Sequence, residues 1–201
     1  MRPSCKTPPR GRRPLQHWVF CALFSAMIAV GAFIQIPVPY MDYFTLQFFF
    51  VTLAGLLMGP ALGSLCAAVY VAVGLMGIPV FAAGGGISYI FRPSFGFLLG
   101  FIAAAALSGF ISVRLNAAAR TGVHAFWRYL LAALAGMLVT YGIGFAYKYY
   151  ILNFHTGQAT PFLVVLLSAF PLDLPGDAVL CIGAAALAGR LGRILRKEHL
   201  I

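Results

Sequence analysis

The sequence predicts an all-α membrane protein with six transmembrane helices and both termini in the cytoplasm. Hydrophobic residues make up 62% of the 201 residues and charged residues only 9%, whereas an ordinary soluble domain carries about 25% charged residues. The net charge of +10 is concentrated at the chain ends, with five of the fourteen Lys and Arg in residues 1–14 and four in residues 190–201. Basic ends are typical of segments held in the cytoplasm. We expect a single integral membrane domain over residues 1–201, because the length leaves no room for a second.

Three apolar runs follow the basic cytoplasmic tail of residues 1–14. Residues 17–36 form the first run, which matches the ~20 residues needed to cross a bilayer and exceeds the core of about 7–15 residues in a secretory signal. Residues 44–59 and 61–78 form the second and third runs. A Gly-Pro pair separates these two, and proline begins a helix readily because the first helical position needs no N–H donor. The sequence therefore predicts a retained first helix and a tight hairpin after the second.

Residues 79–94 interrupt this pattern with three consecutive glycines and two prolines, which predicts a loop. Further apolar runs predict a fourth span at residues 95–113, a fifth at about 128–150 and a last at 162–190. Within the last span we expect an outer re-entrant segment or a loop break near residues 170–176.

The distribution of cations supports an even number of spans. With both ends inside, twelve of the fourteen Lys and Arg fall in cytoplasmic segments, and the outer side keeps only Arg92 and Lys148. An odd number of spans would put one basic end outside, against the positive-inside bias.

Small residues recur at a spacing of four in two of the predicted helical stretches, as Gly59-x-x-x-Gly63 and Gly96-x-x-x-Gly100. Such spacing lets helix backbones approach closely in lipid. We therefore expect tight helix packing at these positions.

Several functional classes lack their signatures here. The four cysteines show no C-x-x-C spacing and the four histidines are scattered, so we predict no metal site, no cofactor and no disulfide framework. The ATP-binding P-loop, H-E-x-x-H and G-x-S-x-G motifs are missing from the sequence, which argues against an enzyme. No nucleic-acid-binding motif accompanies the positive charge.

The stretch FPLDLPGDAVL, residues 170–180, places Asp173 and Asp177 between apolar runs. Ionisable groups at membrane depth indicate a functional site, and the partner we expect for Asp177 is Arg92. Alternatively, the aspartates cap the final helix, which is expected to start near Asp177, and Arg92 reaches the lipid headgroups. We interpret Lys148, within YKYY, as a cation reaching the interface beside an aromatic belt.

The glycine-rich loop and the aromatic residues around it predict a lid. Gly85 stands in the middle of the triple glycine and Tyr89 follows four residues later. Glycines permit close approach and movement of the backbone, and aromatic rings offer a stacking surface for an apolar ligand. The alternative is an ordinary interfacial belt of aromatic residues.

Several stretches closely resemble the BioY family, the biotin-specific substrate-binding (S) components of energy-coupling factor (ECF) vitamin importers. The resemblance rests on FTLQ, LAGLLMGPALG, GIPVFAAGGG, RPSFGFLLGF and LPGDAVL, and it covers roughly residues 15–190. It implies six helices, a biotin pocket near the outer face, and energising by a membrane T component and two ATPases. It further implies that Ala22 and Ala26 on the first helix meet the T component. Some family members occur without these partners, so solitary or oligomeric function is the alternative.

The resemblance also assigns site residues. It implies that Asp177 contacts biotin, but Leu180 stands where the family has a lysine. We therefore hypothesise that Arg92 replaces the missing charge, by balancing Asp177 or by meeting the valerate carboxylate of biotin. Thr45 and Gln47 are expected to be polar pocket groups, the alternative being a helix cap.

Residues 40–43, YMDY, resemble an insertion that lengthens the first outer loop. Together, the sequence features and the resemblance predict biotin uptake across the cytoplasmic membrane by a multi-pass binding protein. Its alternatives are an S component for another small vitamin, an intramembrane enzyme that uses Asp173 and Asp177 as paired acids, and a structural subunit that binds no small molecule.

Overall fold

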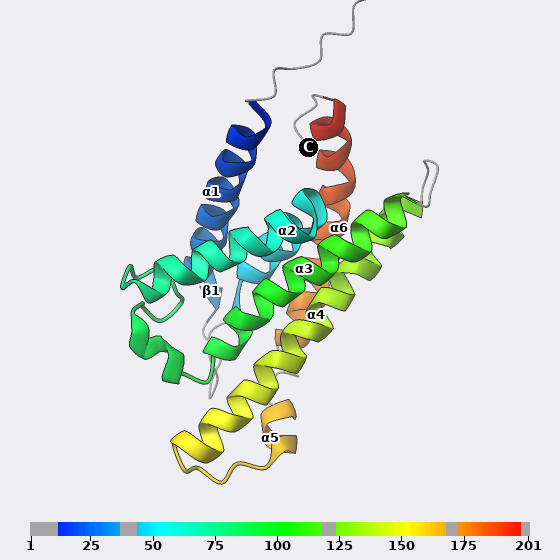
Figure 1. Ribbon diagram of the computed structural model, residues 1–201. Helices are drawn as coiled ribbons and strands as arrows, with labels where there is room; N and C mark the ends of the chain where they lie inside the picture. Colours follow the sequence, from blue (N-terminus) through cyan, green and yellow to red (C-terminus); the bar gives the residue numbers. More distant parts are fainter. Residues whose placement is uncertain (1–11, 37–43, 118–123, 168–172, 198–201) are drawn as a thin grey trace, which may run out of the picture.

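The computed structural model describes residues 12–36, 44–117, 124–167 and 173–197. The insertion at residues 40–43 and most of the basic tail lie outside these ranges. The described part is almost entirely helical (Figure 1). Its elements are α1 (Arg12–Phe33), β1 (Gln35–Ile36), β2 (Phe44–Thr45), α2 (Gln47–Leu75), the 3-10 helix η1 (Ile87–Phe91), α3 (Phe95–Ala117), α4 (His124–Tyr150), the π-helix η2 (Ile151–His155), α5 (Phe162–Leu167) and α6 (Asp173–Lys197).

Five helices in the described ranges are long and apolar enough to cross a membrane, namely α1, α2, α3, α4 and α6. The two spans predicted at residues 44–59 and 61–78 fall within α2, which is broken by non-helical Gly59 (φ 78°, ψ −177°) followed by Pro60. The chain reverses there, since a Cβ on Gly63 would lie only 2.7 Å from Cα of Gly55. This confirms the predicted Gly-Pro turn, and the positive φ explains the need for glycine.

Helix α1 ends at Phe33, before the predicted end at residue 36, and α2 begins at Gln47, after the predicted start at residue 44. Between them, β1 (Gln35–Ile36) and β2 (Phe44–Thr45) form a small antiparallel ribbon, in which Gln35 pairs with Thr45. The Leu46 N–H also donates to the carbonyl oxygen of Gly31, at 3.1 Å. The ribbon satisfies backbone groups that a helix would have used, which explains the difference.

The final helix begins at Asp173 and continues to Lys197, beyond the predicted limits at Asp177 and Arg190. Pro175 fits inside its first turn because N–H groups there have no intrahelical partner. The separate short helix α5 covers Phe162–Leu167, so the predicted span at residues 162–190 consists of two helices.

Close backbone contacts hold the helices together. Helix α3 packs between α2 and α4, α1 packs on α2, and α6 packs on α2 and α4. A Cβ on Gly109 would lie 2.6 Å from the backbone at Gly59 and Pro60, and one on Gly100 would lie 2.9 Å from Thr140. The expected close packing at small residues is confirmed.

The described ends of the chain, at the start of α1 and the end of α6, lie at the same end of the molecule (Figure 1). The loop between α2 and α3 lies toward the opposite end. Phe81 fixes this loop, because its ring is buried beside Gly74, where a side chain would collide with it. The rings of Tyr70 and Tyr89 pack on Phe81 at centroid distances of 5.5 and 4.5 Å. The predicted loop is therefore confirmed, with η1 inside it.

Candidate functional site

A cavity lies beneath the loop between α2 and α3, among the starts of α2, α3 and α6 and the C-terminal part of α4. It encloses about 850 Å³ of space free of protein atoms, its open mouth included. Of the predicted site residues, four line it: Thr45, Gln47, Tyr89 and Asp177. The structure therefore gathers groups that are up to 132 positions apart in the sequence, from Thr45 to Asp177.

The acidic wall of the cavity comes from α6. Asp173 and Asp177 both line it, because residues four apart share one face of a helix. The hydroxyl group of Tyr141 on α4 donates a hydrogen bond to Oδ2 of Asp177 at 2.9 Å. A carboxylate in apolar surroundings needs such donors, and its other acceptor positions remain able to receive hydrogen bonds from a ligand.

Phe44 connects this acidic wall to the start of α2. Its ring lines the cavity and packs directly on Gly176, where an added Cβ would lie 2.6 Å from Cε2 and Cζ. Glycine just before Asp177 therefore allows α6 to approach the β2 segment closely. Asp177 thereby lines the same cavity as Thr45 and Gln47.

A chain of hydrogen bonds forms a second polar wall. The hydroxyl group of Thr45 donates to Oε1 of Gln47 at 3.0 Å, and Nε2 of Gln47 donates to the hydroxyl oxygen of Tyr70. The Tyr70 hydroxyl in turn donates to the carbonyl oxygen of Val80 at 3.1 Å. Because Gln47 is buried, these bonds stabilise its position, and they join α2 to the loop above the cavity.

Aromatic side chains form the remaining wall. The rings of Phe97, Tyr141 and Phe145 contact one another at centroid distances of 5.3–6.0 Å. The rings of Phe48 and Phe101 form a second pair in this wall, with centroids 6.3 Å apart. All five line the cavity, so it offers an apolar surface for a ring system beside its polar groups.

Arg92 and Gly85 do not line the cavity. Arg92 is exposed and its guanidinium carbon lies over the ring of Tyr89, 5.4 Å from the centroid. Arg92 directly follows η1 and has an extended backbone (φ −83°, ψ 141°). Gly85 approaches the backbone so closely that a Cβ would collide with the carbonyl group of Ile78.

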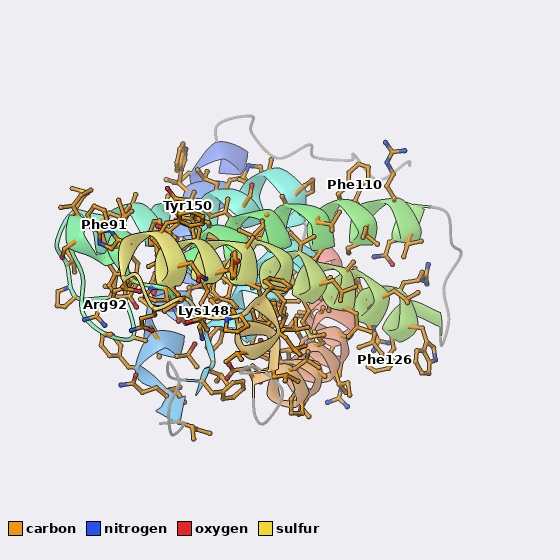
Figure 2. The ribbon with its side chains drawn as sticks, turned by 90° about the horizontal axis from the view of Figure 1, so that it is seen from below. Phe91, Arg92, Phe110, Phe126, Lys148 and Tyr150 are labelled. Carbon is orange, nitrogen blue, oxygen red and sulfur yellow. The ribbon has the colours of Figure 1, made fainter. Side chains whose placement is uncertain are left out.

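Lys148 lines the cavity, which corrects our interpretation that it points to the membrane interface. It lies in the last turn of α4, seven residues after Tyr141, and so on the same helix face. Figure 2 shows Lys148 toward the middle of the molecule and Arg92 at its edge. The sequence held a usable signal for this wall, because Tyr141, Phe145 and Lys148 follow the i, i+4, i+7 spacing of one face.

Ala22 and Ala26, the residues expected to meet a membrane partner, lie one turn apart on α1. Both are exposed, and the larger side chains of Trp18, Leu23 and Val30 around them are also more than half exposed. No residue in the described ranges covers this face of α1.

In the described ranges, no three His, Cys, Asp or Glu side chains gather as a metal site would require. The cavity combines aromatic walls with carboxylate, amide, hydroxyl and ammonium groups at defined places. Such a site in a bundle of apolar helices defines a multi-pass membrane protein that binds a small, partly apolar solute. The sequence matches the BioY family over residues 5–197, and this chain belongs to that family.

Individual relatives agree with this assignment. The probable biotin transporter BioY of Lysinibacillus sphaericus is 37% identical over 183 residues, which cover 91% of this chain and 90% of that protein. The biotin transporter BioY of Thermotoga maritima is 35% identical over 142 residues, 70% of this chain and 76% of that protein. The crystal structure of the S-component for biotin from an ECF-type ABC transporter shares the fold, with a TM-score of 0.78 at 24% identity, and the match covers 90% of this chain and 93% of that one.

Proposed function

We propose that this protein binds biotin at the outer face of the cytoplasmic membrane and carries it inward as the S component of an ECF transporter. The observation that carries the proposal is the cavity that Asp177, Gln47 and an aromatic wall line together, in a chain 37% identical to a probable biotin transporter. Transport rather than catalysis is supported by the family match and by relatives named as biotin transporters.

The chemistry of biotin suits these walls. Its ureido ring carries two N–H donors and one carbonyl acceptor, and the Asp177 carboxylate is an acceptor for such donors. Thr45, Gln47 and Tyr89 are the polar groups we assign to the remaining ureido contacts. The fused rings have an apolar face that packs on the aromatic wall of Phe97 and Phe145.

We further propose six crossings with both termini in the cytoplasm. Two observations support this count: the chain reverses at Gly59 within α2, and the described ends of α1 and α6 lie at the same end of the molecule. Both described ends are basic, with Arg12 and Arg13 at the start of α1 and Arg193, Arg196 and Lys197 at the end of α6, which the positive-inside rule associates with a cytoplasmic side. The cavity then opens toward the outer side.

The energy source is proposed to lie in separate subunits, a membrane T component and two ATPases. The uncovered face of α1 around Ala22 and Ala26 supports a docking role for that helix, since small residues permit close approach between helices in lipid.

Uptake of radiolabelled biotin tests the proposal. Cells that lack their own biotin importer are given this protein alone, or with T and ATPase subunits, and the Asp177→Asn variant serves as the matched control. We expect accumulation that unlabelled biotin competes away and that the variant loses. The proposal would be contradicted if the variant accumulated biotin normally. It would also be contradicted if neither protein accumulated biotin, whether expressed alone or with T and ATPase subunits.

A further inference from the structure

The cavity contains one positively charged side chain among its described lining residues, and this is Lys148. Two carboxylates, Asp173 and Asp177, line the same cavity from α6. Lys148 forms no ion pair with any residue in the described ranges. A partly buried ammonium group in a cavity with apolar walls is costly unless an anion meets it there.

The other cations in the described ranges are poorly placed for this role. Arg92 is exposed and lies over Tyr89 outside the cavity lining. Arg128 is at the opposite end of α4, twenty residues before Lys148, or about 30 Å away along the helix. Leu180, one turn after Asp177, carries no charge and does not line the cavity.

We infer that Lys148 binds the carboxylate of the ligand, an inference that rests on the proposed function. Tyr141 fixes Asp177 at one point of α4, and Lys148 lies seven residues further along that helix, about 10 Å at the rise of an α-helix. A fused ring followed by a four-carbon chain covers this separation. A biotin molecule with its ureido ring at Asp177 therefore directs its valerate carboxylate toward Lys148.

The competing role for Lys148 is to balance the charges of Asp173 and Asp177. The two roles differ in what they predict for a ligand without a carboxylate. A lysine that only balances the aspartates affects charged and neutral ligands alike. A lysine that binds the ligand carboxylate distinguishes biotin from biotinamide, in which a neutral carboxamide replaces that group.

The experiment measures the dissociation constants of biotin and biotinamide for the purified, full-length protein in detergent. We expect the unaltered protein to prefer biotin by about tenfold or more, since a hydrogen bond to a charged group contributes about 1.5–3 kcal/mol. Lys148→Met should bind both ligands equally and retain its biotinamide affinity, which also shows that it folds. Lys148→Arg should keep the preference. Arg193→Met, which removes an exposed cation of α6, is the matched control.

If Lys148→Met still prefers biotin over biotinamide as strongly as the unaltered protein, the inference is overturned. It is also overturned if Arg92→Met loses this preference while Lys148→Met keeps it. Equal losses for both ligands in Lys148→Met would assign the lysine to charge balance and would also overturn it. Each of these results leaves biotin binding by the unaltered protein intact. Failure of the unaltered protein to bind either ligand would instead contradict the proposed function, and the inference with it.

Discussion

The hydroxyl group of Tyr141 donates a hydrogen bond to the Asp177 carboxylate across 2.9 Å, which joins α4 to α6 at the wall of the cavity. This bond holds the carboxylate toward the space that the ligand is proposed to occupy. The ring of Tyr141 also belongs to the aromatic wall. One residue therefore both bonds to the acidic group and contributes to the apolar lining of the cavity.

Tyr141→Phe separates these two contributions, because it removes the donor and keeps the ring. We expect biotin affinity to fall about tenfold to a hundredfold, as a hydrogen bond to a charged group contributes about 1.5–3 kcal/mol. Equilibrium binding measures the change. Tyr150→Phe, at an exposed tyrosine near the end of the same helix, is the control and should bind normally. Equal or tighter binding by Tyr141→Phe would show that the bond does not position the carboxylate.

Tyr70→Phe tests the link between α2 and the loop above the cavity. The substitution leaves the Gln47 amide and the Val80 carbonyl without their shared partner, and an unsatisfied buried polar group costs about 1–3 kcal/mol. Thermal unfolding in detergent should show a midpoint several degrees lower. An unchanged midpoint would mean that the chain of hydrogen bonds does not stabilise the fold.

Gly176→Ala tests the approach of α6 to Phe44. The new methyl group would lie 2.6 Å from two atoms of the Phe44 ring, so the ring must move within the cavity that it lines. Such overpacking costs about 1–3 kcal/mol, and we expect biotin to bind about tenfold or more weakly. Gly189→Ala, on the same helix with nothing within 4 Å, should leave binding unchanged. Equal affinities of both variants would contradict this account of Gly176.

Gly109→Ala tests the close contact of α3 with the reversal in α2. Its methyl group would lie 2.6 Å from backbone atoms of Gly59 and Pro60, which cannot rotate away as a side chain can. We expect the free energy of unfolding to fall by about 1–3 kcal/mol. Gly142→Ala, in open space on α4, should have the opposite sign, because alanine favours a helix over glycine by about 1 kcal/mol. A comparison of the two unfolding midpoints gives the answer, and equal shifts would refute the packing argument.

The sequence predicted most of the long helices and part of the site, but not the division of residues 162–190 into two helices. Apolar runs and the Gly-Pro pair encode local preferences, so the turn at Gly59 and the loop over residues 79–94 were predictable. Asp177 stood out as an ionisable group between apolar runs, whereas Thr45 and Gln47 were expected from the resemblance to the BioY family; all three line the cavity.

The short ribbon of β1 and β2 was not predicted, because strands of two residues leave no periodic pattern. The i, i+4, i+7 spacing places Tyr141, Phe145 and Lys148 on one face of α4, but it does not show that this face lines the cavity. The direction of Arg92 was also beyond the sequence. Which face of α4 points inward depends on how it packs against α3 and α6, and the direction of Arg92 depends on how η1 folds over α2. Both are tertiary effects that spacing along the chain does not encode.

The most direct test of the account is equilibrium binding of labelled biotin to the purified protein in detergent, alongside Asp177→Asn. We predict saturable binding of one biotin per protein, and its loss in the variant, since a carboxamide lacks the charge and one of the acceptor groups of the carboxylate. Absence of biotin binding by the unaltered, folded protein, or full binding by Asp177→Asn, would contradict the central claim that this cavity is a biotin site built around Asp177.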